Sequence, residues 1–231
     1  MPLLSSLPSR LAQAIYLNNW ALFLRTLRVS SSTHRCRLCL ATDALSAICA
    51  ACSADLPWLS GAKQQRELIG GSLRGAFSYE SPINLMIIGA KYRREVGLSA
   101  LLGHLLASHI HTTNIDADLL VPIPMPWPRL LLRGHNHVVP MAQAASSVLG
   151  VPLNTQLLVR KGWQRPQKGL SRKARLQNLA QAFQLNGDVG GRAVMLIDDV
   201  STTGATIETA AKVLLAGGAR KVDALVVALR S

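Results

Sequence analysis

The chain has 231 residues, of which 49% are hydrophobic and 16% charged, and its formal net charge is +13. This length suits one large α/β domain or a medium domain with a small module, and the apolar content excludes a disordered chain. No apolar run reaches the roughly 18–20 residues that a membrane-spanning helix needs. We therefore expect a cytoplasmic protein without a membrane span.

The first segment, residues 1–33, has apolar residues at helical spacing, namely Leu7, Leu11, Ile15, Leu22 and Leu27. This period predicts an amphipathic helix. Polar residues interrupt the segment and no small-residue cleavage site follows it, so we do not interpret it as a signal peptide. Such a helix packs on its own domain or binds a membrane surface or a partner, and the sequence leaves these alternatives open.

All four cysteines lie in residues 34–60, as two C-x2-C pairs separated by nine residues: Cys36, Cys39, Cys49 and Cys52. Each pair can present two thiolates to one tetrahedral ion, so the spacing predicts a zinc ribbon. A redox pair is the alternative, but it would not need the second C-x2-C. A shell of four thiolates leaves no position for substrate, which predicts a structural zinc rather than a catalytic one.

Strand and helix patterns alternate over residues 70–231. The expected strands are 73–80, 118–124, 154–160, 192–200 and 221–229, and the expected helices are 81–110 (as one or two), 138–150, 171–183 and 205–215. This alternation predicts a doubly wound, mainly parallel sheet. Ligands bind such sheets outside the carboxyl ends of their strands.

The stretch "VMLIDDVSTTGAT" lies at such an end and contains two adjacent acids, Asp198 and Asp199. Carboxylates can accept hydrogen bonds from the diol of a ribose, and a loop before a helix can hold its 5-phosphate through backbone N–H groups. We expect the loop donors to be Ser201, Thr202, Thr203, Gly204, Ala205 and Thr206. The alternative is a capped strand–helix turn without a ligand.

A strand, two acids and T-T-G-x-T resemble the binding signature of type I phosphoribosyltransferases. That resemblance implies phosphoribosyl pyrophosphate (PRPP) as the ligand, Mg²⁺ as its companion, and Asp198 and Asp199 as the candidate catalytic residues. Members of the superfamily normally transfer a pentosyl group by displacing pyrophosphate. Several relatives keep the loop and only bind or regulate.

The order of motifs from Cys36 onward is similar to the ComF/GntX family. The residues that match its patterns are Arg133, Gly134, Asn136, Gln167, Leu170, Arg175, Asn178 and Phe183. His135 and His137 replace the usual Phe and Gln. The resemblance implies a role in natural competence and DNA uptake, with a helicase or channel as possible protein partners.

Nine Lys and Arg residues and no acid lie between Leu119 and Gly187. This distribution predicts a site for a polyanion. The candidate contacts to pyrophosphate or DNA are Arg129, Arg133, Lys168, Arg172, Lys173 and Arg175. The prolines of residues 121–128 lack the N–H groups that a pyrophosphate loop uses, so Arg129 and Arg133 would have to compensate.

Three functions therefore remain open from the sequence. The chain binds PRPP or a related ribose phosphate and handles single-stranded DNA, which the resemblance and the basic segment favour. Alternatively, it is an active phosphoribosyltransferase of nucleotide salvage, or a DNA-binding adaptor whose ligand loop is vestigial.

Overall fold

The computed structural model describes residues 35–36, 38–42, 48–92, 96–110, 115–161 and 182–230. The chain divides into two compact units, Met1–Pro57 and Trp58–Ser231. The helices expected over residues 1–33 and over residues 171–183 lie outside the described residues, apart from the last two positions of the second. No helix among the described residues combines the length and hydropathy needed to cross a bilayer.

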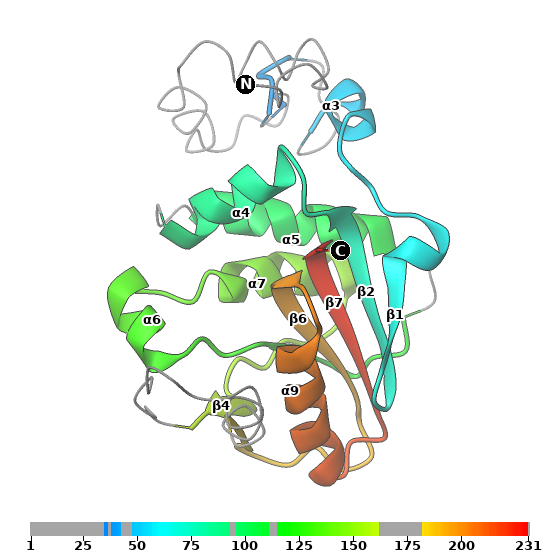
Figure 1. The fold of residues 1–231 in the computed structure, drawn as a ribbon, viewed down its shortest axis with the longest axis vertical. Helices are drawn as coiled ribbons and strands as arrows, with labels where there is room; N and C mark the ends of the chain where they lie inside the picture. The colour runs from blue at the N-terminus through cyan, green and yellow to red at the C-terminus, as the bar shows by residue number, and fades with distance from the viewer. Residues whose placement is uncertain are drawn as a thin grey trace. The chain divides into compact units, whose positions relative to one another are not determined.

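The larger unit is built on a five-stranded sheet with the order β1-β2-β7-β6-β3 (Figure 1). Its strands are β1 (Gln65–Leu68), β2 (Gly71–Ser78), β3 (Leu119–Pro122), β6 (Ala193–Ser201) and β7 (Lys221–Leu229). Only β1 is antiparallel to its neighbour, and the other pairs are parallel. The predicted mainly parallel sheet is confirmed.

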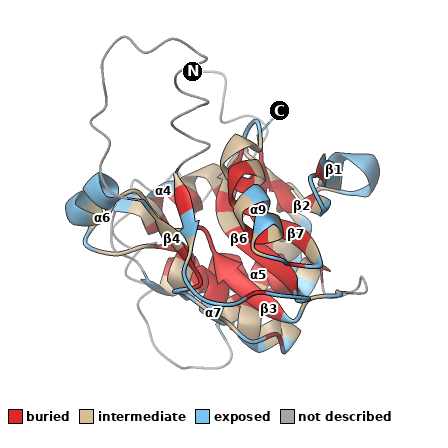
Figure 2. Ribbon diagram, turned by 90° about the horizontal axis from the view of Figure 1, so that it is seen from below, coloured by how far each residue is buried: buried red, intermediate tan, exposed pale blue. Residues whose placement is uncertain are grey.

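The central strands are buried on both faces, as parallel strands between helical layers must be. In β7 every residue after Lys221 is buried, and in β6 the run from Ala193 to Ile197 is buried (Figure 2). Burial in β6 becomes partial at Asp198, where the strand reaches its carboxyl end. The apolar run thus ends where the polar motif begins.

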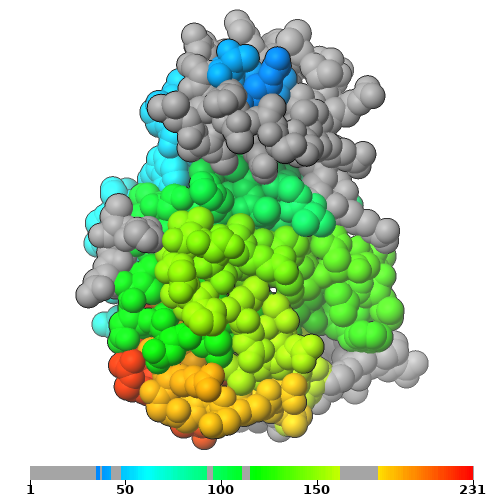
Figure 3. Space-filling view, turned by 180° about the vertical axis from the view of Figure 1, so that it is seen from behind, coloured from blue at the N-terminus to red at the C-terminus, as the bar shows by residue number. Residues whose placement is uncertain are grey.

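Helices cover both faces of the sheet, which is the doubly wound arrangement that the sequence predicted. On one side lie α5 (Val96–Ile110) and α7 (Val138–Leu149), preceded by α4 (Ile83–Tyr92), and on the other lies α9 (Ala205–Ala216) (Figure 1). Atoms of the side that carries α5 and α7, coloured green to yellow-green, fill much of the face seen in Figure 3. Gly103 permits the close approach of α5 and α7, because a Cβ there would lie 2.0 Å from the Met141 carbonyl oxygen.

The strand expected at residues 154–160 is only partly confirmed. It is the short β4 (Leu158–Arg160), which pairs with β5 (Phe183–Leu185) in a separate antiparallel sheet instead of extending the main one. Asn154 explains the departure, because its Oδ1 accepts the N–H groups of Gln156 and Leu157 and turns the chain after a single bridge to β3. The short strand ends at Arg160.

The carboxyl ends of β2, β7 and β6 are in register. Ser78 pairs with Leu229, and Leu229 pairs with Ser201. The residues just beyond these positions, Tyr79, Arg230 and Thr202, therefore emerge side by side at one edge of the sheet.

Candidate functional site

The loop after β6 leads into α9 through a glycine whose backbone other residues rarely adopt. Gly204 has φ +78° and precedes Ala205, the first residue of the helix. The first N–H groups of a helix have no partner within it and favour an anion. A small cavity of ≈ 50 Å³ lies against this loop and is lined by residues 200–207 together with Asp198.

Ser201 provides an unsatisfied donor in this small cavity. Its side chain is almost fully buried, with 3% exposure, and its Oγ has no hydrogen-bond partner among the described residues. Buried hydroxyls are normally paired, because leaving one unpaired costs free energy. An oxygen-rich ligand in the loop would satisfy it.

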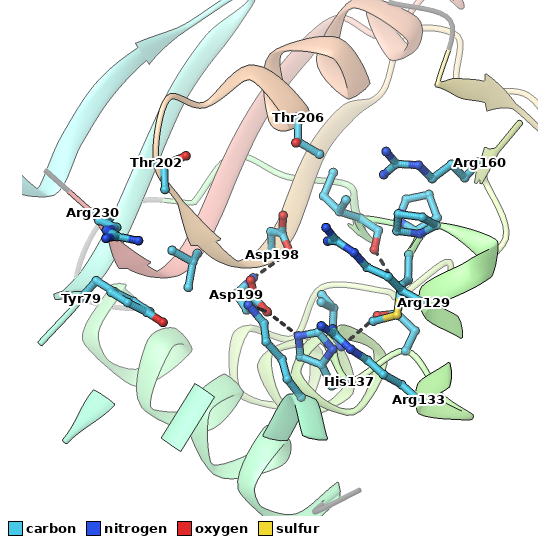
Figure 4. Close-up of a pocket in the computed structure, with 18 residues that line it drawn as sticks. Tyr79, Arg129, Arg133, His137, Arg160, Asp198, Asp199, Thr202, Thr206 and Arg230 are labelled. Atoms are coloured by element: carbon cyan, nitrogen blue, oxygen red, sulfur yellow. Dashed lines mark hydrogen bonds and ion pairs between the residues drawn. The ribbon is translucent and has the colours of Figure 1, made fainter. Parts of the chain in front are cut away.

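The small cavity adjoins a larger one of ≈ 590 Å³ at the carboxyl edge of the sheet (Figure 4). Asp198, Asp199, Thr202 and Thr206 line it from β6, the loop and the start of α9. Five Lys and Arg side chains complete the charged lining, namely Lys91, Arg129, Arg133, Arg160 and Arg230. In the described part of the chain, cations therefore outnumber carboxylates around this cavity.

The two adjacent acids have different surroundings. Asp199 is buried, and its Oδ2 accepts from Lys91 Nζ at 2.8 Å and from His137 Nε2 (Figure 4). Burial by itself would raise the pKa of Asp199, but the hydrogen bond from His137 and the charge of Lys91 lower it below its usual value. Asp199 is therefore ionised and fixed.

Asp198 is only partly buried and faces both cavities. Its Oδ1 accepts the Asp199 backbone N–H at 2.8 Å. Burial, followed by the like charge of Asp199, raises the pKa of Asp198 to about 8. Of the two acids, Asp198 is the one that lacks a cationic partner in direct contact within the described residues.

Arginines from several elements converge on the cavity. Arg129 and Arg133 belong to α6 (Trp127–Arg133), and Arg133 Nη2 donates to Tyr92 Oη at 3.3 Å. Arg160, at the end of β4, lies over the Phe183 ring at 5.0 Å, and burial lowers its pKa. Figure 4 shows these arginines on one side of the two acids, with Arg230 and Tyr79 on the other.

Among the predicted site residues, Asp198, Asp199, residues 201–206, Arg129 and Arg133 line the two adjoining cavities. The other predicted basic contacts, Lys168, Arg172, Lys173 and Arg175, lie outside the described residues. Asn136 joins the segment after β3 to the start of α7, because its Nδ2 donates to the Ile123 carbonyl and its Oδ1 accepts from Val138 N–H.

Sequence reasoning did not name Tyr79, Lys91, His137 or Arg230 as site residues, and it counted Arg160 only among the nine basic residues between Leu119 and Gly187. Three of them, Tyr79, Arg160 and Arg230, end or directly follow a strand. Because ligands bind at the carboxyl ends of parallel strands, polar residues at the ends of all predicted strands were a usable signal. Lys91 and His137 lie on or next to helices and gave no such signal.

The smaller unit contains the four predicted metal ligands. Their Sγ atoms all lie within 4.8 Å of one another, so the four cysteines can bind one metal ion. Cys39 Sγ and Cys49 Sγ are 3.6 Å apart, close to the separation of about 3.8 Å that tetrahedral zinc with Zn–S bonds of about 2.3 Å imposes.

Backbone N–H groups point at the sulfurs of this cluster. Leu38 and Cys39 donate to Cys36 Sγ at 3.4 and 3.5 Å, and Cys52 donates to Cys49 Sγ at 3.5 Å from the start of α3 (Ala50–Ala54). Such bonds stabilise thiolates, the form in which cysteine binds a metal. The residues present therefore fit a structural zinc ion.

Comparison with known proteins gives a domain-family match and a structural neighbour of low similarity. A family model described as phosphoribosyl transferase domain matches residues 136–231. A solved purine phosphoribosyltransferase from Pyrococcus horikoshii superposes with a TM-score of 0.37 and 18% identity, over 57% of this chain and 73% of that one. The mainly parallel sheet and the matched domain define a protein of the type I phosphoribosyltransferase fold.

Within this class, two curated relatives are close enough to align. DNA utilization protein YhgH of Salmonella typhimurium is 31% identical over 150 residues, which cover 63% of this chain and 66% of that protein. Competence protein F of Haemophilus influenzae is 29% identical over 154 residues, covering 63% and 67%. The alignment with YhgH thus spans just under two thirds of its length, and these matches confirm the resemblance to the ComF/GntX family.

Proposed function

We propose that the cavity binds PRPP or a closely related ribose 5-phosphate. The observation that carries this proposal is the junction of two cavities: a small cradle with an unsatisfied Ser201 hydroxyl opens beside a larger space that holds two carboxylates and an excess of cations. The cradle suits a phosphate, the carboxyl group of Asp198 suits a diol, and the arginines suit a second phosphate group.

The pyrophosphate would be held mainly by side chains. Pro122, Pro124 and Pro126 lie in the segment that runs from β3 to α6 and have no N–H to donate. Arg129 and Arg133 follow on α6 and line the cavity. A guanidinium can bind phosphate oxygens with two parallel hydrogen bonds, so two arginines can replace missing backbone donors.

Magnesium is the expected companion of PRPP. Its chemistry is to neutralise pyrophosphate oxygens, usually while retaining several waters. Asp198 lines the cavity and, among the described residues, its Oδ1 accepts only a backbone N–H, so it is the acid that we expect to face such a hydrated ion. Asp199 is already occupied by Lys91 and His137.

Isothermal titration calorimetry with PRPP and Mg²⁺ tests the proposal. We expect heat for the wild type and for Glu67→Gln, which neutralises an exposed acid outside the cavity, and no heat for the Asp198→Asn/Asp199→Asn double variant. Absence of heat from the wild type would refute ribose-phosphate binding. Pyrophosphate release from PRPP in the presence of free nucleobases would extend the proposal from binding to pentosyl transfer.

Single-stranded DNA is the macromolecular partner that we propose for the same unit. The names of the curated relatives refer to DNA utilization and competence, and the segment between Leu119 and Gly187 has nine basic residues and no acid. On α6, Trp127 is 57% exposed and lies on the same short helix as Arg129 and Arg133. Exposed aromatics beside arginines can stack bases while the arginines bind the DNA phosphates.

Fluorescence anisotropy with a labelled oligothymidine tests this second part. We expect binding that weakens steeply with salt, because several phosphates are neutralised. Trp127→Ala should weaken binding about tenfold or more, whereas Arg192→Ala, at an exposed position outside the cavity, should have little effect. No binding at low salt would refute the DNA proposal and leave the ligand proposal intact.

A further inference from the structure

Asp199, the second acid of the pair, belongs to a buried charge cluster with Lys91 and His137, and binding of a ribose phosphate does not require such a cluster. Lys91, near the end of α4, reaches Asp199 Oδ2 at 2.8 Å, and its side chain is only 22% exposed. His137, at the start of α7, donates to the same oxygen and is 3% exposed. Two helices thus converge on one carboxylate oxygen, which fixes its position from two directions.

This cluster does not fit a divalent cation at Asp199. A magnesium ion bound to Asp199 would compete with an ammonium and an imidazole for Oδ2, or would use Oδ1 while lying close to the positive charge of Lys91. Mg²⁺ also demands near-ideal octahedral geometry and dehydrates reluctantly. The Lys91 ammonium occupies the place that a cation would take.

The fixed position of Asp199 also determines how Asp198 is presented. The Asp199 backbone N–H donates to Asp198 Oδ1 at 2.8 Å. Within the part of the chain that the structure describes, no side chain donates to Asp198 Oδ2, and this residue lines both cavities. Fixing Asp199 therefore also fixes its backbone N–H, which bonds Asp198 Oδ1, and leaves Oδ2 of Asp198 for a ligand.

We propose that Lys91 is a built-in counter-ion that disfavours divalent metals at Asp199, and that Lys91 and His137 are positioning residues which fix Asp199 and leave Asp198 as the acid that is not already paired with a cation. This inference deepens the proposed ribose-phosphate site. It assigns different roles to two acids that look equivalent in sequence. Any magnesium that accompanies the ligand is then held by ligand oxygens and water on the Asp198 side.

A metal-only experiment tests the inference without relying on the proposed ligand. Electron paramagnetic resonance of Mn²⁺ added to the ligand-free protein, with its zinc content held constant, reports how much metal binds. We expect weak or no binding by the wild type, by Lys91→Arg and by the exposed control Lys63→Met. Lys91→Met should bind Mn²⁺ at least about tenfold more tightly, which is about 1.4 kcal/mol.

Further variants locate the new metal site. The gain in Mn²⁺ affinity should disappear in Lys91→Met/Asp199→Asn and persist in Lys91→Met/Glu67→Gln. Circular dichroism would show that each variant is folded. If Lys91→Met does not fold, Lys91→Gln replaces it. Unchanged Mn²⁺ affinity in a folded Lys91→Met or Lys91→Gln variant, or tight binding by the wild type that Asp199→Asn abolishes, would overturn the inference.

Ligand titration gives a second readout. Ribose 5-phosphate is the better probe here, because it lacks the pyrophosphate that binds Mg²⁺ itself. We expect the wild type to bind it in the presence of a chelator, and Lys91→Met to bind it more weakly with chelator but to recover with Mg²⁺. A wild type that binds neither ribose 5-phosphate nor PRPP would refute the proposed function, while the Mn²⁺ result would still decide the role of Lys91.

Discussion

Replacing the two adjacent acids one at a time should change stability in opposite directions. Asp199→Asn removes the charge that compensates Lys91 and the strongest acceptor for His137. Removing one partner of a fully buried pair costs roughly 3–5 kcal/mol. Because Lys91 retains 22% exposure and Asn still accepts hydrogen bonds, we expect a loss of about 2–3 kcal/mol in the free energy of unfolding.

Asp198→Asn should instead stabilise the ligand-free protein at alkaline pH. The folded-state pKa of Asp198 is raised to about 8 by burial and by Asp199. At pH values between the pKa of Asp198 in the unfolded state and its pKa in the folded state, the native state binds more protons than the unfolded state. Wild-type stability therefore falls as the pH rises through that interval. Each pKa unit corresponds to about 1.4 kcal/mol. Water in the cavity relieves part of this penalty, and we expect a gain of about 1–2 kcal/mol at about pH 9.

Urea unfolding followed by circular dichroism at about pH 5, pH 7 and pH 9 measures both effects. The advantage of Asp198→Asn should grow with pH. The deficit of Asp199→Asn should be fully present at neutral pH and shrink only in acid, because the pKa of Asp199 is lowered in the folded state. Equal losses for the two variants, or an advantage of Asp198→Asn that does not grow between about pH 5 and pH 9, would refute the assignment of distinct environments to the pair.

Three further outcomes follow from the geometry. Ser201→Ala should weaken ribose 5-phosphate binding about tenfold by calorimetry. It should leave stability unchanged or up to ~1 kcal/mol higher, because it removes an unsatisfied buried hydroxyl. Normal affinity would exclude Ser201 from the phosphate cradle. Arg129→Ala/Arg133→Ala should weaken PRPP binding at least about tenfold more than ribose 5-phosphate binding, since only PRPP carries the second group; equal losses would contradict the pyrophosphate role. Cys36→Ser/Cys39→Ser should abolish zinc binding in elemental analysis. If the wild-type protein, purified under reducing conditions, contains no zinc, the metal site is contradicted.

The sequence predicted those parts of the fold that depend on local patterns. The apolar runs of β6 and β7 are buried on both faces, and α9 begins directly after the glycine of the motif. Strand β4 was misjudged because its partner, β5, follows more than twenty residues later and because a turn at Asn154 separates it from β3. A single sequence shows that a segment is extended, but not which strand it will pair with.

The same limit applies to the candidate site. The acids and the loop lie within nine residues, so their proximity is guaranteed by the chain. Lys91 and His137 reach Asp199 from 108 and 62 positions away in sequence, and nothing local marks either residue as its partner. Their effect on the pair therefore emerges only when the helices pack around the end of β6.

The balance of charge in the cavity favours a ligand with more than one phosphate. Lys91 is neutralised by Asp199, which leaves four arginines beside one acid, Asp198, in the described lining. A phosphate monoester carries about two negative charges, so a single phosphate in the loop would leave part of this positive potential unbalanced. A pyrophosphate on the α6 side would balance it, and it would also neutralise the arginines that Asp198 does not reach. For this reason we expect PRPP to bind more tightly than ribose 5-phosphate, and we expect its advantage to shrink as ionic strength rises.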